Sequence, residues 1–171
     1  GIMNIDVLSF IRLSHRIFEE TGRETKHVLD DEGKNLILRK IAGQYESELK
    51  VLRGNLKKQG YISEVKSVIS EFTQYGIGFD ELDEMIDSLG EESYLSYKLR
   101  DIRTVYEGFE NYLADKYITK EELLDVLSDA VPESKILKDS VVVLDGYTGF
   151  TPVQNRLLGE LLKVCKKVMI T

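Results

Sequence analysis

The chain has 171 residues, 42% of them hydrophobic, which is enough for one domain with a sizeable core or for one domain with an insertion. Its net charge of −7 argues against a dedicated nucleic-acid-binding domain that acts by neutralising phosphates. The sequence shows neither a long apolar run nor a basic leader before an apolar stretch, so we expect no membrane span, no signal peptide and a cytoplasmic location. A single cysteine, Cys165, excludes an internal disulfide and a multi-cysteine metal site within the chain.

The first residues predict a short strand followed by a helix. Residues 5–9 are typical of a strand that runs into a turn. From Phe10 the apolar residues recur at helical spacing, and Gly22 is the expected end of that helix. Residues 23–33 are polar and are predicted to be a connection.

A long helical region is expected next. Apolar residues recur at steps of three and four over residues 38–56, but Gly43 and Gly54 weaken the pattern and allow a break, and Gly60 is the predicted end. Ser63 is the expected N-cap of the following helix, which Gly76 closes. Asp80 is the expected N-cap of a short helix after it.

The clearest helix of the sequence covers residues 95–113. Its apolar residues alternate steps of four and three, which is typical of a seam in a helical bundle. These residues are Leu95, Leu99, Ile102, Tyr106, Phe109 and Leu113. Thr119 and Glu122 predict a capping box that opens another helix, and Pro132 ends it.

The last thirty residues predict a strand, a capped helix and a second strand. Residues 141–145 are branched and apolar up to a final aspartate, which is typical of a strand buried on both faces of a parallel sheet. Thr151 is a good N-cap, Pro152 suits the first helical position, and Gln154 completes a capping box. Residues 167–171 predict the next strand. So few strands predict a sheet that is completed by chain outside this sequence, and hence a fragment.

Asp145 is the candidate for ligand chemistry, because it falls at the carboxyl edge of the predicted sheet. One hypothesis is a Walker B element, whose aspartate holds a magnesium ion bound to nucleotide phosphates. The alternative is an ordinary strand that ends in an Asp-Gly turn. The chain contains no G-x-x-x-x-G-K-[ST] motif, and Gly146 stands where an active motor usually has a glutamate, so we predict no hydrolysis and no catalytic residue.

Basic residues form two groups that could follow a nucleic-acid backbone. One stripe contains Lys50, Arg53 and Lys57, and an early group includes Arg12. The alternative for both is a solvated helix face. Neither histidine has partners at zinc-binding spacing, so no metal site is predicted, and Cys165 is expected to be a buried small hydrophobe.

The final stretch, VVVLDGYTGFTPVQNRLLGELLKVCKKVMIT, resembles the degenerate Walker B region of AddB (RexB), the second subunit of the bacterial AddAB helicase–nuclease. The early stretch VLSFIRLSHRIFEETG resembles the family's segment where active superfamily 1 helicases have a Thr-Phe-His motif that contacts single-stranded DNA. Ser9-Phe10-Ile11 replaces that motif here, so its histidine is missing. The resemblance implies that Asp145, Gly146 and Gln154 are relics of Walker B.

The resemblance implies an α/β, predominantly helical fold: a partial parallel sheet of a P-loop helicase-like motor domain with a large all-helical insertion. The expected divisions are 1–28 and 136–171 for the motor domain and 29–135 for the insertion. Candidate DNA contacts are Ser9, Phe10, Arg12, Lys50, Arg53 and Lys57. No cofactor is expected in this fragment, whereas the parent family uses ATP, magnesium and an iron–sulfur cluster.

The function that follows is a non-hydrolysing scaffold and DNA guide in double-strand-break processing. Its partners would be an AddA-type motor and nuclease subunit and single- or double-stranded DNA, with no membrane. One alternative is a helical protein–protein interaction domain with no nucleic-acid role. Another is a small α/β enzyme that uses Asp145, for which the sequence offers no second catalytic group.

Overall fold

The computed structural model describes residues 4–24, 26–55, 58–90, 93–114 and 116–171, which fold into two compact units. The sheet unit consists of residues 1–26 and 120–171, and the helical unit consists of residues 27–119. The divisions predicted from the sequence stay predictions. No helix among the described residues is both long and apolar enough to cross a membrane.

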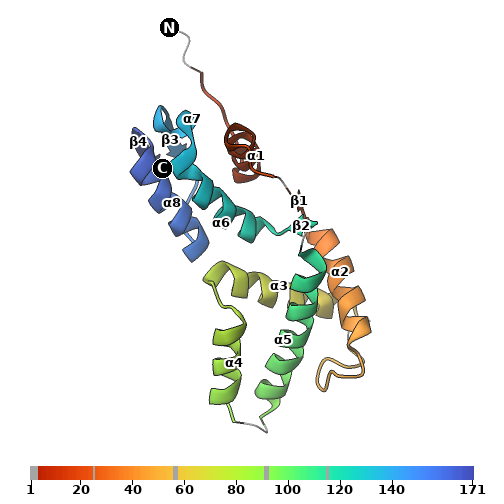
Figure 1. Ribbon diagram of the computed structural model, residues 1–171. Coiled ribbons are helices and arrows are strands. Elements are labelled where there is room, and N and C mark those ends of the chain that lie inside the picture. The colour runs from red at the N-terminus through yellow and green to blue at the C-terminus, as the bar shows by residue number, and fades with distance from the viewer. Residues whose placement is uncertain (1–3, 25, 56–57, 91–92, 115) are drawn as a thin grey trace. The chain divides into compact units, whose positions relative to one another are not determined.

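In the sheet unit, α6 packs against both α1 and α8, and two strands pair beside them (Figure 1). Its elements are α1 (Phe10–Thr21), α6 (Lys120–Ala130), the 3₁₀ helix η1 (Val131–Glu133), α7 (Lys135–Lys138), β3 (Val141–Leu144), α8 (Pro152–Val164) and β4 (Lys167–Ile170). The helices bury apolar stripes at helical spacing, as amphipathic helices do. The residues in these stripes are Ile17, Phe18, Leu123, Leu127, Val153, Leu157 and Leu161.

Strands β3 and β4 are parallel and in register from Val141 opposite Lys167 to Leu144 opposite Ile170. Helix α8 connects them, as expected for a parallel pair. The predicted burial on both faces is wrong. Val141 and Val143 are 55% and 51% exposed, whereas Leu144 is buried. The reason is that alternate side chains point to opposite faces, and one face of this pair has no helical cover in the described part of the chain.

The helical unit is a bundle of four helices with a short pair of parallel strands where the chain enters and leaves it (Figure 1). Its elements are β1 (His27–Val28), α2 (Asp31–Gln44), α3 (Gln59–Tyr75), α4 (Phe79–Ser88), α5 (Tyr94–Leu113) and β2 (Tyr117–Ile118). Helix α5 contacts the three other helices, which matches its predicted role as the seam of a bundle. A mostly helical chain with small parallel sheets is consistent with the α/β class.

Several predicted boundaries are wrong. Residues 5–9 form no strand, and the predicted connection over residues 23–33 contains β1 and the start of α2. The break that the glycines allow in the helical region over residues 38–56 is present, because α2 ends at Gln44, directly after Gly43. Gly60 lies inside α3 instead of ending a helix.

Helix caps explain where the helices begin and end. Gly22 and Gly76 end α1 and α3 at φ of 70° and 68°, as predicted, because glycine adopts this left-handed backbone without steric cost. The predicted N-caps Ser63 and Asp80 are wrong. Helix α3 starts after Lys58, and α4 starts after Gly78, whose N–H donates to the Glu81 carboxylate at 3.0 Å.

The seam of α5 is exposed at its first position, Leu95, and partly buried at its second, Leu99, while its other positions are buried. Ile102, Phe109 and Leu113 are at most 2% exposed, but Leu95 is 48% exposed, so its predicted burial is wrong. Leu95 lies in the first turn of α5, beyond the helices that cover the rest of the seam. Cys165 is half-buried and not fully buried as expected, and its partial burial raises the pKa of the thiol.

Candidate functional site at the carboxyl end of the parallel strands

A carboxylate lies at the carboxyl end of the strand pair β3–β4. Asp145 directly follows β3, and its exposed carboxylate accepts a hydrogen bond of 2.7 Å from the hydroxyl of Thr171, which follows β4. The Thr171 backbone N–H donates to the Leu144 carbonyl at 3.0 Å and extends the strand ladder. Both strand ends are thereby tied together beside an acidic group, at the edge where open parallel sheets place their ligands.

Gly146 and Gln154 have structural tasks at the same end of the sheet unit. Gly146 has a φ of 79°, and its N–H donates to the Thr171 carbonyl at 3.1 Å. A glutamate at this position would be strained, because side chains disfavour this backbone. The Gln154 side chain accepts from the Thr151 N–H at 3.0 Å, and the Thr151 hydroxyl accepts from the Gln154 N–H at 3.4 Å. The predicted capping box is confirmed, while descent from a Walker B motif stays a prediction.

Three aromatic side chains gather where α1 begins and β3 ends. The Tyr147 and Phe150 rings are stacked, with centroids 5.1 Å apart and planes inclined by 8°. The Phe10 ring lies 5.9 Å from Tyr147 at an angle of 54°. We call these three residues the aromatic cluster. All three side chains are partly exposed, and partly exposed aromatic side chains are the usual stacking platform for nucleic-acid bases.

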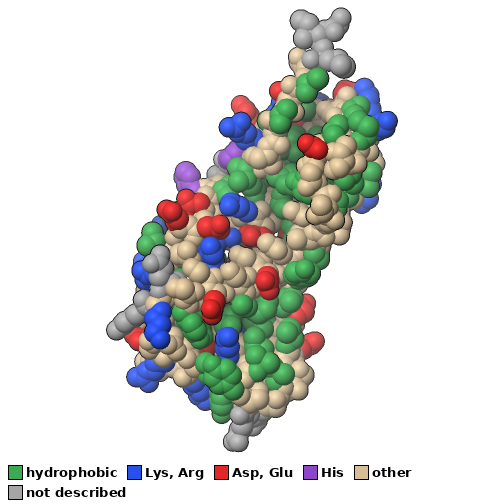
Figure 2. All heavy atoms as spheres, turned by 180° about the vertical axis from the view of Figure 1, so that it is seen from behind, with side chains coloured by type: hydrophobic (Ala, Val, Ile, Leu, Met, Phe, Trp, Pro, Cys, Tyr) green, Lys and Arg blue, Asp and Glu red, His purple; other side chains and the backbone are tan. Residues whose placement is uncertain are grey.

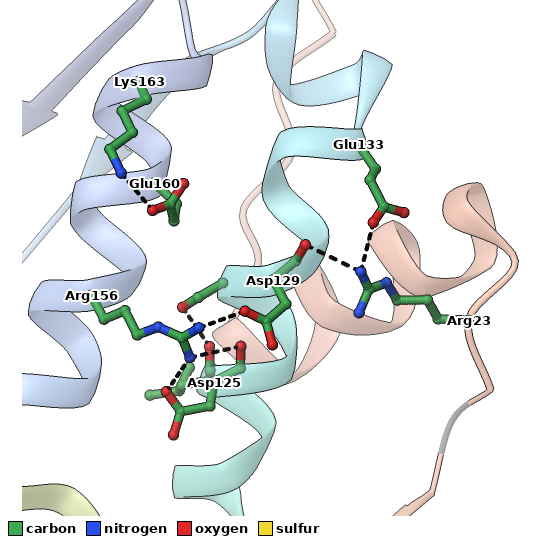
Figure 3. Close-up of polar contacts among 9 residues, drawn as sticks. Arg23, Asp125, Asp129, Glu133, Arg156, Glu160 and Lys163 are labelled. Atoms are coloured by element: carbon green, nitrogen blue, oxygen red, sulfur yellow. Dashed lines mark hydrogen bonds and ion pairs between the residues drawn. The ribbon is translucent and has the colours of Figure 1, made fainter. Parts of the chain in front are cut away.

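An ion-pair network joins the helices of the sheet unit (Figure 3). Arg156 on α8 donates to Asp125 at 2.6 Å and to Asp129 at 2.5 Å, both on α6. The hydrogen bond that Arg156 donates to Asp125 is the main cause that raises the pKa of Arg156, and burial opposes it. Arg23, just after α1, donates to the Asp129 carbonyl at 3.1 Å and to Glu133 at 2.7 Å. These contacts fix both α1 and α8 to the segment formed by α6 and η1. Helix α1 begins with Phe10 of the aromatic cluster, and α8 begins shortly after Phe150.

The predicted DNA contacts near α1 lie at its first turn. Ser9 is the N-cap of α1, and its hydroxyl accepts from the Arg12 N–H at 3.4 Å. Phe10 belongs to the aromatic cluster, and the Arg12 side chain is exposed. The structure therefore places Ser9, Phe10 and Arg12 together, although a role in DNA binding stays a prediction for all three.

The other predicted contacts belong to the helical unit. Lys50 and Arg53 are exposed in the segment between α2 and α3, and the Lys50 ammonium lies 4.4 Å from the centroid of the Tyr97 ring. Lys57 lies outside the described residues. The two sets of predicted contacts thus belong to different units of the chain.

The carboxyl edge offers few ligands for a nucleotide-bound magnesium ion among the described residues. Magnesium takes six oxygen ligands and is usually held by carboxylates together with substrate phosphates, and this edge supplies the carboxylate of Asp145 and the hydroxyl of Thr171. The chain has no phosphate-binding loop motif. Within the described ranges, no three His, Cys, Asp or Glu side chains lie close enough together to hold a metal ion.

Sequence reasoning named Phe10 as a candidate but missed Tyr147, Phe150 and Thr171. The sequence held a partial signal for Tyr147 and Phe150. Both lie in the turn directly after Asp145, where polar residues are usual, so two aromatic residues there are unexpected. Two aromatics in such a turn indicate either a packing partner or a ligand. Thr171 gave no local signal, because its contact with Asp145 depends on strand pairing.

A family model described as "ADDB, N-terminal" matches residues 1–171. A curated protein of Lachnoclostridium phytofermentans, named as a subunit of an ATP-dependent helicase/deoxyribonuclease, is 47% identical over the whole chain. Proteins of the same name from Alkaliphilus oremlandii and Alkaliphilus metalliredigens are 36% and 34% identical, also over the whole chain. The chain spans 15% of the length of each of these relatives.

Proposed function

This chain belongs to the family of AddB N-terminal domains, and from that premise we propose that it is a non-hydrolysing, helicase-like part of a helicase–nuclease subunit. It acts as a scaffold and DNA guide in double-strand-break processing and recombinational repair in the bacterial cytoplasm. Its partner is a motor subunit, in agreement with the word "subunit" in the names of the relatives. In this proposal β3, β4 and the helices around them are part of a P-loop motor domain that has lost its hydrolytic glutamate.

The observation that carries the DNA-guiding role is the aromatic cluster. Phe10, Tyr147 and Phe150 present partly exposed ring faces at the carboxyl end of a parallel strand pair, where such folds bind ligands. Arg12 follows Phe10 on the first turn of α1 and is exposed. Proteins that bind single strands combine aromatic rings, on which bases stack, with basic side chains that contact the phosphates.

The distribution of charge over the two units is compatible with DNA at this site. The helical unit contains 18 acidic and 12 basic residues, whereas the sheet unit contains 12 acidic and 11 basic residues. The negative charge of the chain therefore comes mainly from the helical unit. Phosphates near the aromatic cluster meet an almost neutral unit, so electrostatic repulsion is small there.

We predict that Tyr147→Leu with Phe150→Leu weakens binding of single-stranded DNA. Leucine preserves much of the apolar volume but removes the ring face on which a base stacks. Each stacked base contributes about 1–3 kcal/mol, so the dissociation constant for a fluorescent oligothymidine should rise about tenfold or more in an anisotropy titration. Circular dichroism of the variant should match that of the wild type.

The matched control replaces two exposed tyrosines of the helical unit, Tyr75→Leu with Tyr112→Leu. This pair also removes two aromatic rings and should leave the affinity unchanged. Wild-type binding should also weaken as salt rises, because contacts with phosphates release counterions. Equal loss in both double variants, or tight binding that is indifferent to salt, would contradict the proposal.

The position of Asp145 favours this function over a purely protein-binding helical domain. An interaction domain has no reason to place a carboxylate directly after a parallel strand and to hold it with the hydroxyl that follows the neighbouring strand. The relatives' shared name adds support from a separate source. In this proposal, any protein-binding surface belongs to the helical unit and acts in addition to DNA guiding.

A further inference from the structure

The turn between α4 and α5 exposes apolar side chains that the bundle leaves uncovered. Met85 and Leu89 lie one turn apart at the end of α4 and are 42% and 37% exposed. Tyr94 and Leu95 open α5 and are 69% and 48% exposed. We call these four residues the hairpin-tip patch. Figure 2 shows hydrophobic side chains gathered on the surface in the lower part of the face that it presents.

The patch continues the buried stripes of both helices. On α4, Leu82 and Ile86 are at most 3% exposed, and Leu89 follows on the same face. On α5, the seam that is buried at Ile102 reaches solvent at Leu95. A seam of this spacing is normally covered by a facing helix along its length. The exposed end therefore has the pattern of a helix-packing surface without its helix.

The rim of the patch is acidic. Helix α4 and its caps, residues 78–90, contain five carboxylates and no lysine or arginine, and the first basic residues of α5 are Lys98 and Arg100. Asp83 is paired with Arg103, and the Glu81 side chain caps the start of α4, but Asp80, Glu84 and Asp87 are exposed on the same helix. The field at the hairpin tip is therefore negative.

We propose that the hairpin-tip patch docks an amphipathic helix, rich in lysine or arginine, from another protein chain. The apolar face of such a helix covers Met85, Leu89 and Leu95, and its basic flanks face the carboxylates of α4. Helix-in-groove recognition uses this combination of apolar anchors and charge complementarity. Nucleic acid is the wrong partner here, because its phosphates would face the same carboxylates. This interaction is separate from DNA guiding by the aromatic cluster.

The test uses a synthetic amphipathic helix of leucine and lysine as the probe, and the same peptide with glutamate in place of lysine as the counter-probe. In anisotropy titrations against the full chain, the lysine peptide should bind and the glutamate peptide should not. Amide hydrogen exchange should show protection that is concentrated in residues 85–97. Binding should weaken as salt rises, because the flanking contacts are exposed ion pairs.

Charge reversal on α4 tests the acidic rim. The triple variant Asp80→Lys, Glu84→Lys and Asp87→Lys should weaken binding of the lysine peptide about tenfold or more, because the rim charges become repulsive. All three side chains are exposed, so the fold should persist and the circular dichroism spectrum should be unchanged.

The matched control reverses three exposed carboxylates elsewhere, Glu24→Lys, Glu48→Lys and Glu71→Lys, and changes the net charge by the same amount. It should leave binding within about twofold of wild type, since distant exposed charges are screened by salt. Met85→Ser with Leu95→Ser keeps every charge and should weaken binding about tenfold, because it removes the apolar anchors.

Three outcomes would overturn the proposal: equal loss in the two charge-reversal variants, protection by the lysine peptide outside residues 85–97, or no binding of that peptide. Protection of the same residues by oligothymidine would assign the surface to nucleic acid instead. The variant Tyr147→Leu with Phe150→Leu should leave peptide binding unchanged, which separates this result from that of the DNA-guiding proposal.

Discussion

The buried carboxylate of Asp101 holds the segment between α2 and α3 in place within the helical unit. It lies on α5, is 4% exposed, and accepts hydrogen bonds from the backbone N–H groups of three consecutive residues in the segment between α2 and α3. The Lys50 N–H lies 3.0 Å from each carboxylate oxygen, and those of Val51 and Leu52 donate to Oδ2 at 2.6 and 2.8 Å. These amides have no helical partners, so the carboxylate replaces the hydrogen bonds that a helix would provide.

Asp101→Asn should therefore destabilise the chain by about 3 kcal/mol, because hydrogen bonds to a charged acceptor are lost and the new amide donor faces backbone donors. Urea unfolding followed by circular dichroism measures the change. Hydrogen exchange should speed up at the amides of Lys50, Val51 and Leu52. Asp87→Asn removes an exposed carboxylate and serves as the control with little expected effect. A variant as stable as wild type would show that the carboxylate is dispensable.

At the scale of elements, a carboxylate of α1 holds the start of α7. Glu20 accepts from the Ser134 hydroxyl at 2.6 Å and from the backbone N–H groups of Lys135 and Ile136 at 2.8 and 3.0 Å. The hydrogen bond from Ser134 is the largest cause that lowers the pKa of Glu20 below its ordinary 4.5, opposed by burial and assisted by the two N–H groups. A helix of one turn depends on such an external partner for its free N–H groups.

The lowered pKa predicts acid sensitivity. Because the folded state binds this proton less readily than the unfolded state, falling pH favours unfolding. The contribution of Glu20 is complete above pH 4.5 and is lost as the pH falls through the lowered pKa. Glu20→Gln should be less stable than wild type at pH 7, and the difference in unfolding free energy should shrink as the pH falls below 4.5. Urea titrations across this range measure it. Glu24→Gln, an exposed neighbour, should show no comparable trend.

At the scale of the whole molecule, the chain divides its chemistry between two units. The sheet unit carries the aromatic cluster and Asp145, whereas the helical unit carries most of the negative charge and the hairpin-tip patch. Each unit has its own apolar core. In the two proposals above, nucleic acid meets the almost neutral sheet unit and a basic protein helix meets the more acidic helical unit, so each ligand has the unit that repels it less.

We predict that the chain does not turn over ATP. In the proposed relation to a motor domain, Gly146 stands where an active motor has its hydrolytic glutamate, and the sequence contains no phosphate-binding loop motif. A coupled assay with magnesium and ATP should give the rate of the buffer blank, with and without single-stranded DNA. Asp145→Ala should give the same rate as wild type, so any magnesium-dependent turnover that this substitution abolishes would refute the prediction.

Local hydrogen bonding made several features predictable from the sequence. The glycines that end α1 and α3 and the Thr151–Gln154 capping box depend on residues within one turn of each other. The parallel pairing of β3 and β4 was also predictable, because two apolar strands joined by a helix pair in this way. The resemblance of the terminal motif to AddB agrees with the family match.

The features that could not be predicted from the sequence depend on contacts between residues far apart in the chain. Gly43 allowed a break after α2, but the conformation of residues 50–52 depends on the carboxylate of Asp101, which accepts from N–H groups distant in sequence, and no local pattern encodes that contact. The aromatic cluster exists because the chain returns beside α1 and brings Phe10 to Tyr147. The sequence by itself determined the glycine ends of α1 and α3, the capping box of α8, the strand pair and the family. Only the tertiary structure decided which apolar residues reach solvent, since Val143 and Leu95 are exposed by the lack of a covering element and not by their own chemistry.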